Sequence, residues 1–173
     1  LKHEADQVIL HGVNRLVYHG YPYSPPSAGN PGWVFYASVM ANHNNTWWPY
    51  INLLNVCIAR NSMLSLVGRH VARFAVYIPY HDEWSGKTGV IKALRIALKS
   101  NGHVSDYDYV NDERIINGAR VIDNQLEIGH GRYGALVLYQ TEYMPVDTAR
   151  RVASFIEQGF PVLVVGACPS RAP

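Results

Sequence analysis

Short apolar runs alternate with amphipathic stretches through the second half of the chain. The intervals from Val90 to Leu98 and from Pro145 to Gln158 show helical spacing, and a glycine follows each. The stretch from Leu126 to Gly134 is expected to contain a glycine-rich turn. Strands that alternate with helices form parallel sheets, so a flavodoxin- or amidotransferase-like α/β layer is predicted. The predicted strands are Ala72–Pro79, Tyr107–Val110, Ala135–Tyr139 and Pro161–Val165.

The first half has a different pattern. Lys2–Leu10 is predicted to be a helix, and Arg15–His19 a short strand that opens into the loop Gly20–Gly32, which is dense in turn-forming residues. A second helix is predicted from Trp47 to about Val67, capped by Asn44–Thr46. The pattern changes near Gly68, which divides the chain into residues 1–68 and residues 69–173. The second part is expected to be incomplete at its C-terminus.

Composition narrows the class of protein. The 173 residues suit one domain or two small ones, and a hydrophobic content of 48% excludes disorder as the main state. A net charge of +2 is too small to indicate nucleic acid as a partner. No apolar run reaches the ~18–20 residues that a membrane span needs. The cysteines, Cys57 and Cys168, are too few for a disulfide scaffold and are expected to be buried thiols.

Both ends of the sequence suggest a longer polypeptide. The chain begins without Met or a signal peptide, and it stops just after a strand-like run. We therefore expect it to be a piece of a larger protein, in which case the absence of a leader does not indicate a compartment.

Candidate binding residues gather where the predicted strand Arg15–His19 enters its loop. Ligands bind at such strand ends in α/β proteins, and aromatic rings there stack on the C–H faces of sugars while polar tips take the hydroxyls. His19, Tyr21, Tyr23 and Trp33 are the candidates for substrate contact. The structural alternative is that these rings only pack the loop onto its neighbours. Tyr36, Trp47 and Trp48 enlarge the aromatic group.

Two other motifs are weaker. Ser85–Gly89 resembles part of a phosphate loop, but the required glycine is replaced by His81, and Asp82 and Glu83 would repel phosphate. A capped helix start is the preferred interpretation. Glycosidases need two carboxylates that flank the scissile bond, yet no acid here has a context that singles it out, and Glu83 is expected to cap the next helix or face solvent. No metal-ligand spacing and no nucleophile elbow stand out.

Several stretches carry a family resemblance. They read ADQVILHGVNRLVYHGYPYSP, PGWVFYAS, NTWWPYINLLNVCIARNSML and FAVYIPYHDEW, and they cover roughly Ala5 to Trp84. In these stretches the sequence resembles glycoside hydrolase family 106, whose known members are α-L-rhamnosidases. The later stretch ARRVASFIEQGFPVLVVG looks like the amidotransferase-like α/β domain that follows the catalytic barrel in such enzymes.

The resemblance implies that residues 1–68 are the C-terminal part of a catalytic (β/α) barrel and that the parent enzyme hydrolyses α-L-rhamnosides with inversion. It implies a carbohydrate partner, calcium in the parent and a periplasmic or secreted location. His19, Tyr21, Tyr23 and Trp33 would lie on the catalytic rim. No acid matches the catalytic pair, which is expected upstream of Leu1, so the catalytic residues and metal ligands stay unknown.

One further expectation follows from the resemblance, and one alternative to it stays open. An incomplete barrel leaves apolar surface uncovered, so a second copy could associate through Trp47 and Trp48. The alternative function is a non-catalytic α/β module, either structural or carbohydrate-binding.

Overall fold

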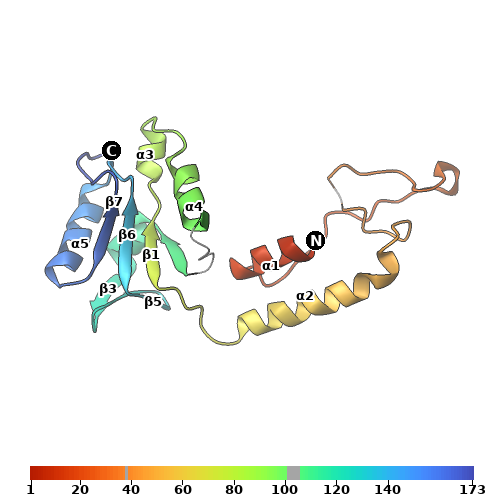
Figure 1. Ribbon diagram of the computed structural model, residues 1–173, viewed down its shortest axis with the longest axis horizontal. Helices are drawn as coiled ribbons and strands as arrows, with labels where there is room; N and C mark the ends of the chain where they lie inside the picture. Colours follow the sequence, from red (N-terminus) through yellow and green to blue (C-terminus); the bar gives the residue numbers. More distant parts are fainter. Residues whose placement is uncertain (38, 101–105) are drawn as a thin grey trace. The chain divides into compact units, whose positions relative to one another are not determined.

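The computed structural model describes residues 1–37, 39–100 and 106–173. The chain forms two compact units, Leu1–Gly68 (unit 1) and Arg69–Pro173 (unit 2). The α/β class is confirmed, because a parallel four-stranded sheet, an antiparallel sheet and helices make up the described chain (Figure 1). None of the described helices combines the length and the apolar content that crossing a bilayer requires.

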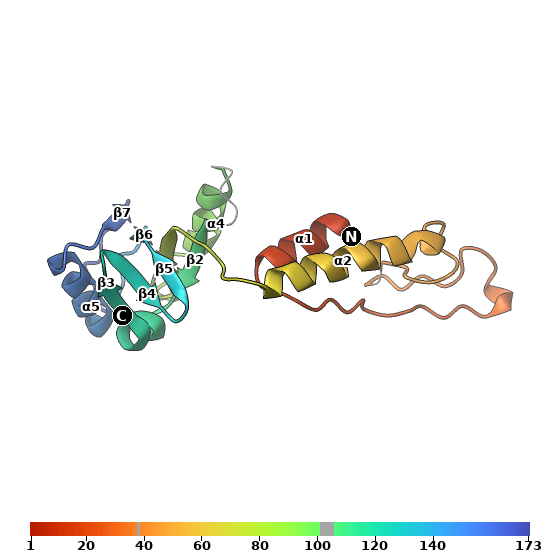
Figure 2. The ribbon, with the colours of Figure 1, turned by 90° about the horizontal axis from the view of Figure 1, so that it is seen from below.

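Unit 1 is built on two helices, α1 (Lys2–Leu10) and α2 (Ile51–Leu66), which pack side by side (Figure 2). Helix α1 has the predicted bounds and buries Ala5 and Ile9. The 3₁₀ turns η1 (Pro26–Ala28) and η2 (Trp48–Tyr50) lie in the long segment between the helices, and η2 leads directly into α2. The segment between the two helices carries all four predicted sugar-contact residues.

The predicted strand Arg15–His19 is wrong: these residues are irregular backbone, and no strand is found among the described residues of unit 1. A strand needs a neighbour for its backbone hydrogen bonds, and the described part of unit 1 offers none. The assignment of residues 1–68 to the end of a barrel stays a prediction.

The loop of unit 1 is held by asparagine side chains instead. Asn42, which is buried, donates its amide to the carbonyl of Pro22 (3.0 Å) and accepts a bond from the backbone N–H of Asn44 (3.0 Å). Asn45 donates to the carbonyl of Met40 and accepts from the N–H of Trp47. Short amide side chains satisfy the irregular backbone in this way, as Asx turns do.

In unit 2 the parallel sheet has the strand order β2-β1-β6-β7. Its central strand β1 buries Ala75, Val76 and Tyr77 completely, which agrees with an apolar run covered on both faces. Counting only these four strands along the chain gives the order 2-1-3-4, the flavodoxin-type arrangement that the sequence predicts. The strand bounds are β1 (Phe74–Tyr77), β2 (Tyr107–Val110), β6 (Ala135–Tyr139) and β7 (Val162–Val165).

Three helices and a π-helical turn connect these strands. Helices α4 and α5 lie where helices are predicted, with ends that shift by two residues or fewer. Helix α5 buries Thr148, Val152 and Phe155. The bounds are α3 (Tyr80–Trp84), α4 (Val90–Ser100), η3 (Arg114–Gly118) and α5 (Val146–Glu157).

A second, antiparallel sheet was not predicted. It has the order β3-β4-β5, with β3 (Ala119–Ile122), β4 (Gln125–Ile128) and β5 (Gly131–Tyr133). The expected turn within Leu126–Gly134 is present at 129–130, but strands flank it. Leu126, Ile128 and Tyr133 point into the core that also holds Phe155. The sheet thus completes the apolar core of unit 2.

The thiols differ from their expected burial. Cys57 is partly buried on α2, and Cys168 is exposed. Cys168 lies beyond β7 in an irregular segment, and such segments usually run over the protein surface.

Replacing Leu126 with alanine tests the role of the antiparallel sheet. Leu126 is fully buried, so Leu126→Ala should destabilise unit 2 by about 2–5 kcal/mol through lost burial and a residual cavity. Chemical denaturation followed by circular dichroism measures the loss. The control is Ile122→Ala in the same sheet, where the side chain is 42% exposed and the cost should be below about 1 kcal/mol. Equal losses for the two variants would show that the sheet does not contribute to the core.

Candidate functional site

A hollow of about 180 Å³ lies in unit 1, between the loop and the start of α2. It has two phenol hydroxyls, one carboxamide and one indole in its wall, and no charged group among the residues that line it. The lining residues are Tyr18, Gly20, Tyr21, Ala41, Trp48, Ile51 and Asn55. Concave, mostly apolar walls with a few fixed polar groups are typical of small-molecule sites.

The polar groups of the hollow are held by partners. Tyr18 donates its hydroxyl to Oδ1 of Asn55 (2.8 Å), and burial raises the pKa of Tyr18, so the phenol stays protonated. The hydroxyl of Tyr21 lies 2.7 Å from Nδ1 of His43, and the two rings are stacked. The Trp48 indole meets the Tyr21 ring edge-on, with ring centroids 5.6 Å apart. These contacts fix the direction of each ring before any ligand arrives.

Only one of the four predicted sugar-contact residues lines this hollow, namely Tyr21. His19 is exposed and rests against the Phe35 ring, with centroids 5.3 Å apart. The side chains of Tyr23 and Trp33 are 71% and 61% exposed. The structure therefore places His19, Tyr23 and Trp33 on the open surface of the loop and does not join them to Tyr21 in one cavity.

The direction of Trp33 depends on the glycine before it. Gly32 has a φ of +89°, in the left-handed region, and a Cβ there would lie 2.9 Å from Nδ2 of Asn44 and still closer to the Ser24 side chain. Ser24 uses its hydroxyl to accept the backbone N–H of Trp33 (2.9 Å). Only glycine fits this crowded turn, which fixes where the following tryptophan leaves the loop.

Three functional candidates were not singled out in the sequence analysis: Tyr18, His43 and Asn55. Tyr18 belonged to a predicted strand, and His43 to a polar loop. Asn55 lies on the face of α2 that also carries Ile51 and follows Trp48 at helical spacing. In the sequence, the signal for Asn55 is a polar residue at helical spacing from the apolar residues Trp48 and Ile51.

Carboxylates are absent from the loop of unit 1. The only acids in residues 1–68 are Glu4 and Asp6, both on α1. Glu4 pairs with the N-terminal amine, and Asp6 pairs with Lys2. A glycosidase needs a general acid and a second carboxylate at the scissile bond. The residues that line the hollow therefore cannot supply that pair.

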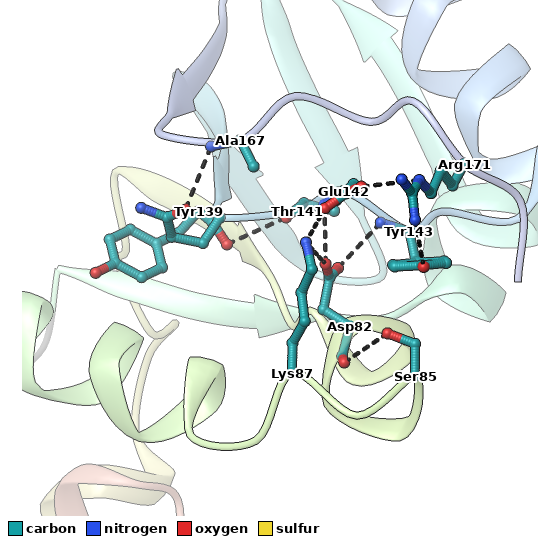
Figure 3. Close-up of polar contacts among 10 residues, drawn as sticks. Asp82, Ser85, Lys87, Tyr139, Thr141, Glu142, Tyr143, Ala167 and Arg171 are labelled. Carbon is teal, nitrogen blue, oxygen red and sulfur yellow. Dashed lines mark hydrogen bonds and ion pairs between the residues drawn. The ribbon is translucent and has the colours of Figure 1, made fainter.

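Two acids of unit 2, Asp82 and Glu142, lie beyond the carboxyl ends of the parallel strands β1 and β6, and Asp82 is fully buried (Figure 3). Its Oδ1 and Oδ2 accept the backbone N–H groups of Glu142 (3.0 Å) and Tyr143 (3.2 Å). Lys87 bonds to Glu142 and places its Nζ 3.6 Å from Oδ1 of Asp82. Arg171 donates to the other oxygen of Glu142 (2.9 Å). All of these carboxylate oxygens have partners from the chain itself.

Asp112, which follows β2, is equally occupied. Its Oδ1 accepts the hydroxyls of Tyr77 (2.8 Å) and Thr148 (2.7 Å), and its Oδ2 lies 3.0 Å from Nε2 of His81. Burial, and then this bond to Asp112, raise the pKa of Tyr77. In 2-1-3-4 sheets ligands bind beside the first and third strands, here β1 and β6. Asp82 and Glu142, which follow these strands, are tied to the protein itself, so the arrangement is structural.

The segment Ser85–Gly89 is the turn that leads into α4, in line with the capped helix start that the sequence analysis prefers. The Glu83 carboxylate accepts the backbone N–H groups of Gly89 (2.8 Å) and Ile91 (3.1 Å) at the beginning of α4. These backbone bonds lower the pKa of Glu83. An anion already occupies the position that a phosphate would take, which confirms the capping role.

No cluster of metal-binding side chains is found in the described part of the chain. Among residues 1–37, 39–100 and 106–173 no group of three or more His, Cys, Asp or Glu side chains is placed to hold a metal ion. We therefore assign no calcium ligand to these residues and derive no chemistry through calcium.

Comparison with known proteins decides the family. The family model described as α-L-rhamnosidase, glycoside hydrolase family 106, matches residues 1–173. The chain belongs to glycoside hydrolase family 106. Its fold is similar to the solved structure of a rhamnosidase from Novosphingobium sp. PP1Y, with 25% sequence identity and a TM-score of 0.67. That likeness covers 99% of this family 106 chain and 16% of the Novosphingobium protein, so the chain spans about one sixth of its length. The chain has no match among the curated proteins.

Lowering the pH should weaken the cap of α4. Because the folded pKa of Glu83 lies below its ordinary value of 4.5, the cap contributes fully above that value and is lost as the pH falls through the folded pKa. Glu83→Gln should lower stability at neutral pH and flatten this acid dependence. Urea denaturation at several pH values measures both effects. Glu157→Gln, at the exposed end of α5, is the matched control and should leave the profile unchanged. A wild-type acid profile in Glu83→Gln would contradict the cap.

Proposed function

We propose that this chain supplies one wall of the sugar-binding surface in an enzyme that hydrolyses α-L-rhamnosides with inversion. The family supports glycoside hydrolysis, and the hollow in unit 1 supports sugar contact. The general acid and base are proposed to come from parts of the enzyme outside this chain. The observation that carries the proposal is an uncharged, pre-oriented hollow of hydroxyl, amide and indole groups.

The chemistry of the hollow suits a deoxy sugar. Rhamnose presents hydroxyl groups on part of its ring and a methyl group with C–H bonds elsewhere. Tyr18, Tyr21 and Asn55 offer hydrogen-bonding atoms, whereas Trp48 and Ile51 offer apolar surface. A site with both kinds of surface positions a sugar by matching its hydroxyls and its C–H faces separately.

The exposed aromatic residues extend this surface beyond the hollow. His19, Tyr23 and Trp33 are proposed to contact substrate outside the hollow, as expected from the family. Their exposure supports this role, because their rings are available to a ligand. The fixed turn at Gly32 supports a constant position for Trp33.

For the strand-end acids of unit 2 we propose a structural role. This applies the non-catalytic alternative of the sequence analysis to this part of the chain. Its carboxylates Asp82, Asp112 and Glu142 are committed to backbone and side-chain partners at the strand ends. A general acid or base must be able to reach a proton on substrate. Groups with all their oxygens engaged stabilise the fold instead.

Removing the Tyr21 hydroxyl tests the wall. In the whole enzyme Tyr21→Phe keeps the ring and deletes one hydrogen-bonding group, so kcat/KM for an aryl α-L-rhamnoside should fall by about 3- to 10-fold, mainly through a higher KM. The matched control is Tyr36→Phe, since Tyr36 is 94% exposed and does not line the hollow. Identical kinetics for the two variants would contradict the proposal that the hollow contacts the substrate.

The isolated chain tests the assignment of the catalytic pair. Residues 1–173 alone should show no turnover of an aryl α-L-rhamnoside, because the loop lacks carboxylates and the strand-end acids Asp82, Asp112 and Glu142 are engaged. Release of the aryl group, followed by absorbance, measures this directly, with the whole enzyme as positive control. Turnover by the chain that the Asp82→Asn or Asp112→Asn variant abolishes would overturn the proposal that the acid and base lie elsewhere.

A further inference from the structure

A second surface, in unit 2, carries features of a binding site. A groove of about 470 Å³ runs along α4 and is lined by Glu83, Ile91, Lys92, Arg95, Ile96 and Lys99. The three cations stand at positions i, i+3 and i+7, which places them on one face of the helix over about 10 Å. The groove therefore presents a row of positive charge along its length.

The cations of this row are not neutralised by neighbouring acids. Lys92, Arg95 and Lys99 are exposed, and within the described part of the chain none of them forms an ion pair. Glu83 is the acid that lines the groove, and its oxygens accept the backbone N–H groups of Gly89 and Ile91. The row keeps its excess positive charge and can receive anions.

An aromatic platform lies next to this row in the sequence. Trp84 follows Glu83 at the end of α3 and is 74% exposed. Its ring is stacked on Tyr80, with centroids 5.5 Å apart and planes 18° from parallel. The His81 ring meets the indole edge-on. An exposed indole supported by neighbouring rings offers a flat apolar face, which suits the C–H face of a sugar.

We propose that this groove, together with Trp84, binds a glycan that carries carboxylate groups. The spaced cations match acidic groups along a chain of sugars, and the indole matches a sugar face. The proposal rests on the proposed function only in taking the ligand to be a glycan. Nucleic acid fits less well, because the net charge of the whole chain is only +2 and the row consists of three cations on one helix.

Binding of polygalacturonate by the chain of residues 1–173 tests the proposal, with its fully methyl-esterified form as the uncharged counterpart. Isothermal titration calorimetry should detect binding of polygalacturonate but no binding of the methyl ester. Added salt should weaken the binding of polygalacturonate. The triple variant Lys92→Gln, Arg95→Gln and Lys99→Gln should bind about tenfold more weakly or worse. Trp84→Ala should weaken binding by about 3- to 10-fold. These side chains are exposed, and circular dichroism confirms that each variant is folded.

The matched control removes the same number of charges elsewhere, at Arg60, Arg69 and Arg150, which are also exposed or largely so. It should bind polygalacturonate within about twofold of wild type. Equal losses in the two triple variants, equal binding of the ester, or tighter binding of poly(U) than of polygalacturonate would overturn the proposal. The probe contains no rhamnose, so failure here leaves the Tyr21 kinetics, and hence the proposed function, to be judged separately.

Discussion

The buried carboxylate of Asp82 organises the hydrogen-bond network at the carboxyl edge of the parallel sheet in unit 2. A charged group without exposure is tolerated only when hydrogen bonds and an opposite charge replace its water. Two backbone N–H groups from the segment after β6 and the ammonium of Lys87 do this. The bonds join α3 to the segment that begins at Glu142, and Arg171 extends the same network to the C-terminal residues (Figure 3).

This network engages the carboxylates at the sheet edge where folds of flavodoxin type bind their ligands. In this family 106 chain, Asp82, Asp112 and Glu142 thus form hydrogen bonds and ion pairs within unit 2. The hollow in unit 1 is lined by uncharged groups. The hollow lies in unit 1, whereas the engaged carboxylates and the groove along α4, with its row of cations, lie in unit 2.

Local sequence patterns were sufficient for most of unit 2. The strands Tyr107–Val110 and Ala135–Tyr139 were predicted with the bounds that the structure has. The second is a contiguous apolar run, which leaves little ambiguity. The antiparallel sheet was missed, although Asp123 and Asn124 both have positive φ and form a turn suited to a hairpin. Its strands alternate apolar residues with charged ones such as Arg120 and Glu127, and this period-two signal was not used.

Unit 1 was harder to predict because its contacts join distant residues. The strand Arg15–His19 was inferred from apolar residues alone, but a strand also needs a partner. Tyr21 was identified from the aromatic loop, whereas its partner His43 and the pair Tyr18–Asn55 depend on how the loop returns to α2. Tyr18 and Asn55 lie 37 residues apart, and no local pattern specifies such a contact. The sequence therefore predicts that the site is rich in aromatic residues, but not which residues line it.

Gly32 in the sequence PGW is required by the backbone conformation and not by the reaction. Its left-handed backbone and the crowding by Ser24 and Asn44 exclude every side chain there, whatever sugar the enzyme processes. The triplet is thus a steric signature: it reports how the polypeptide bends, not which glycoside is cleaved. Enzymes that differ in linkage or leaving group could share it unchanged, and their selectivity would have to be sought in the neighbouring side chains.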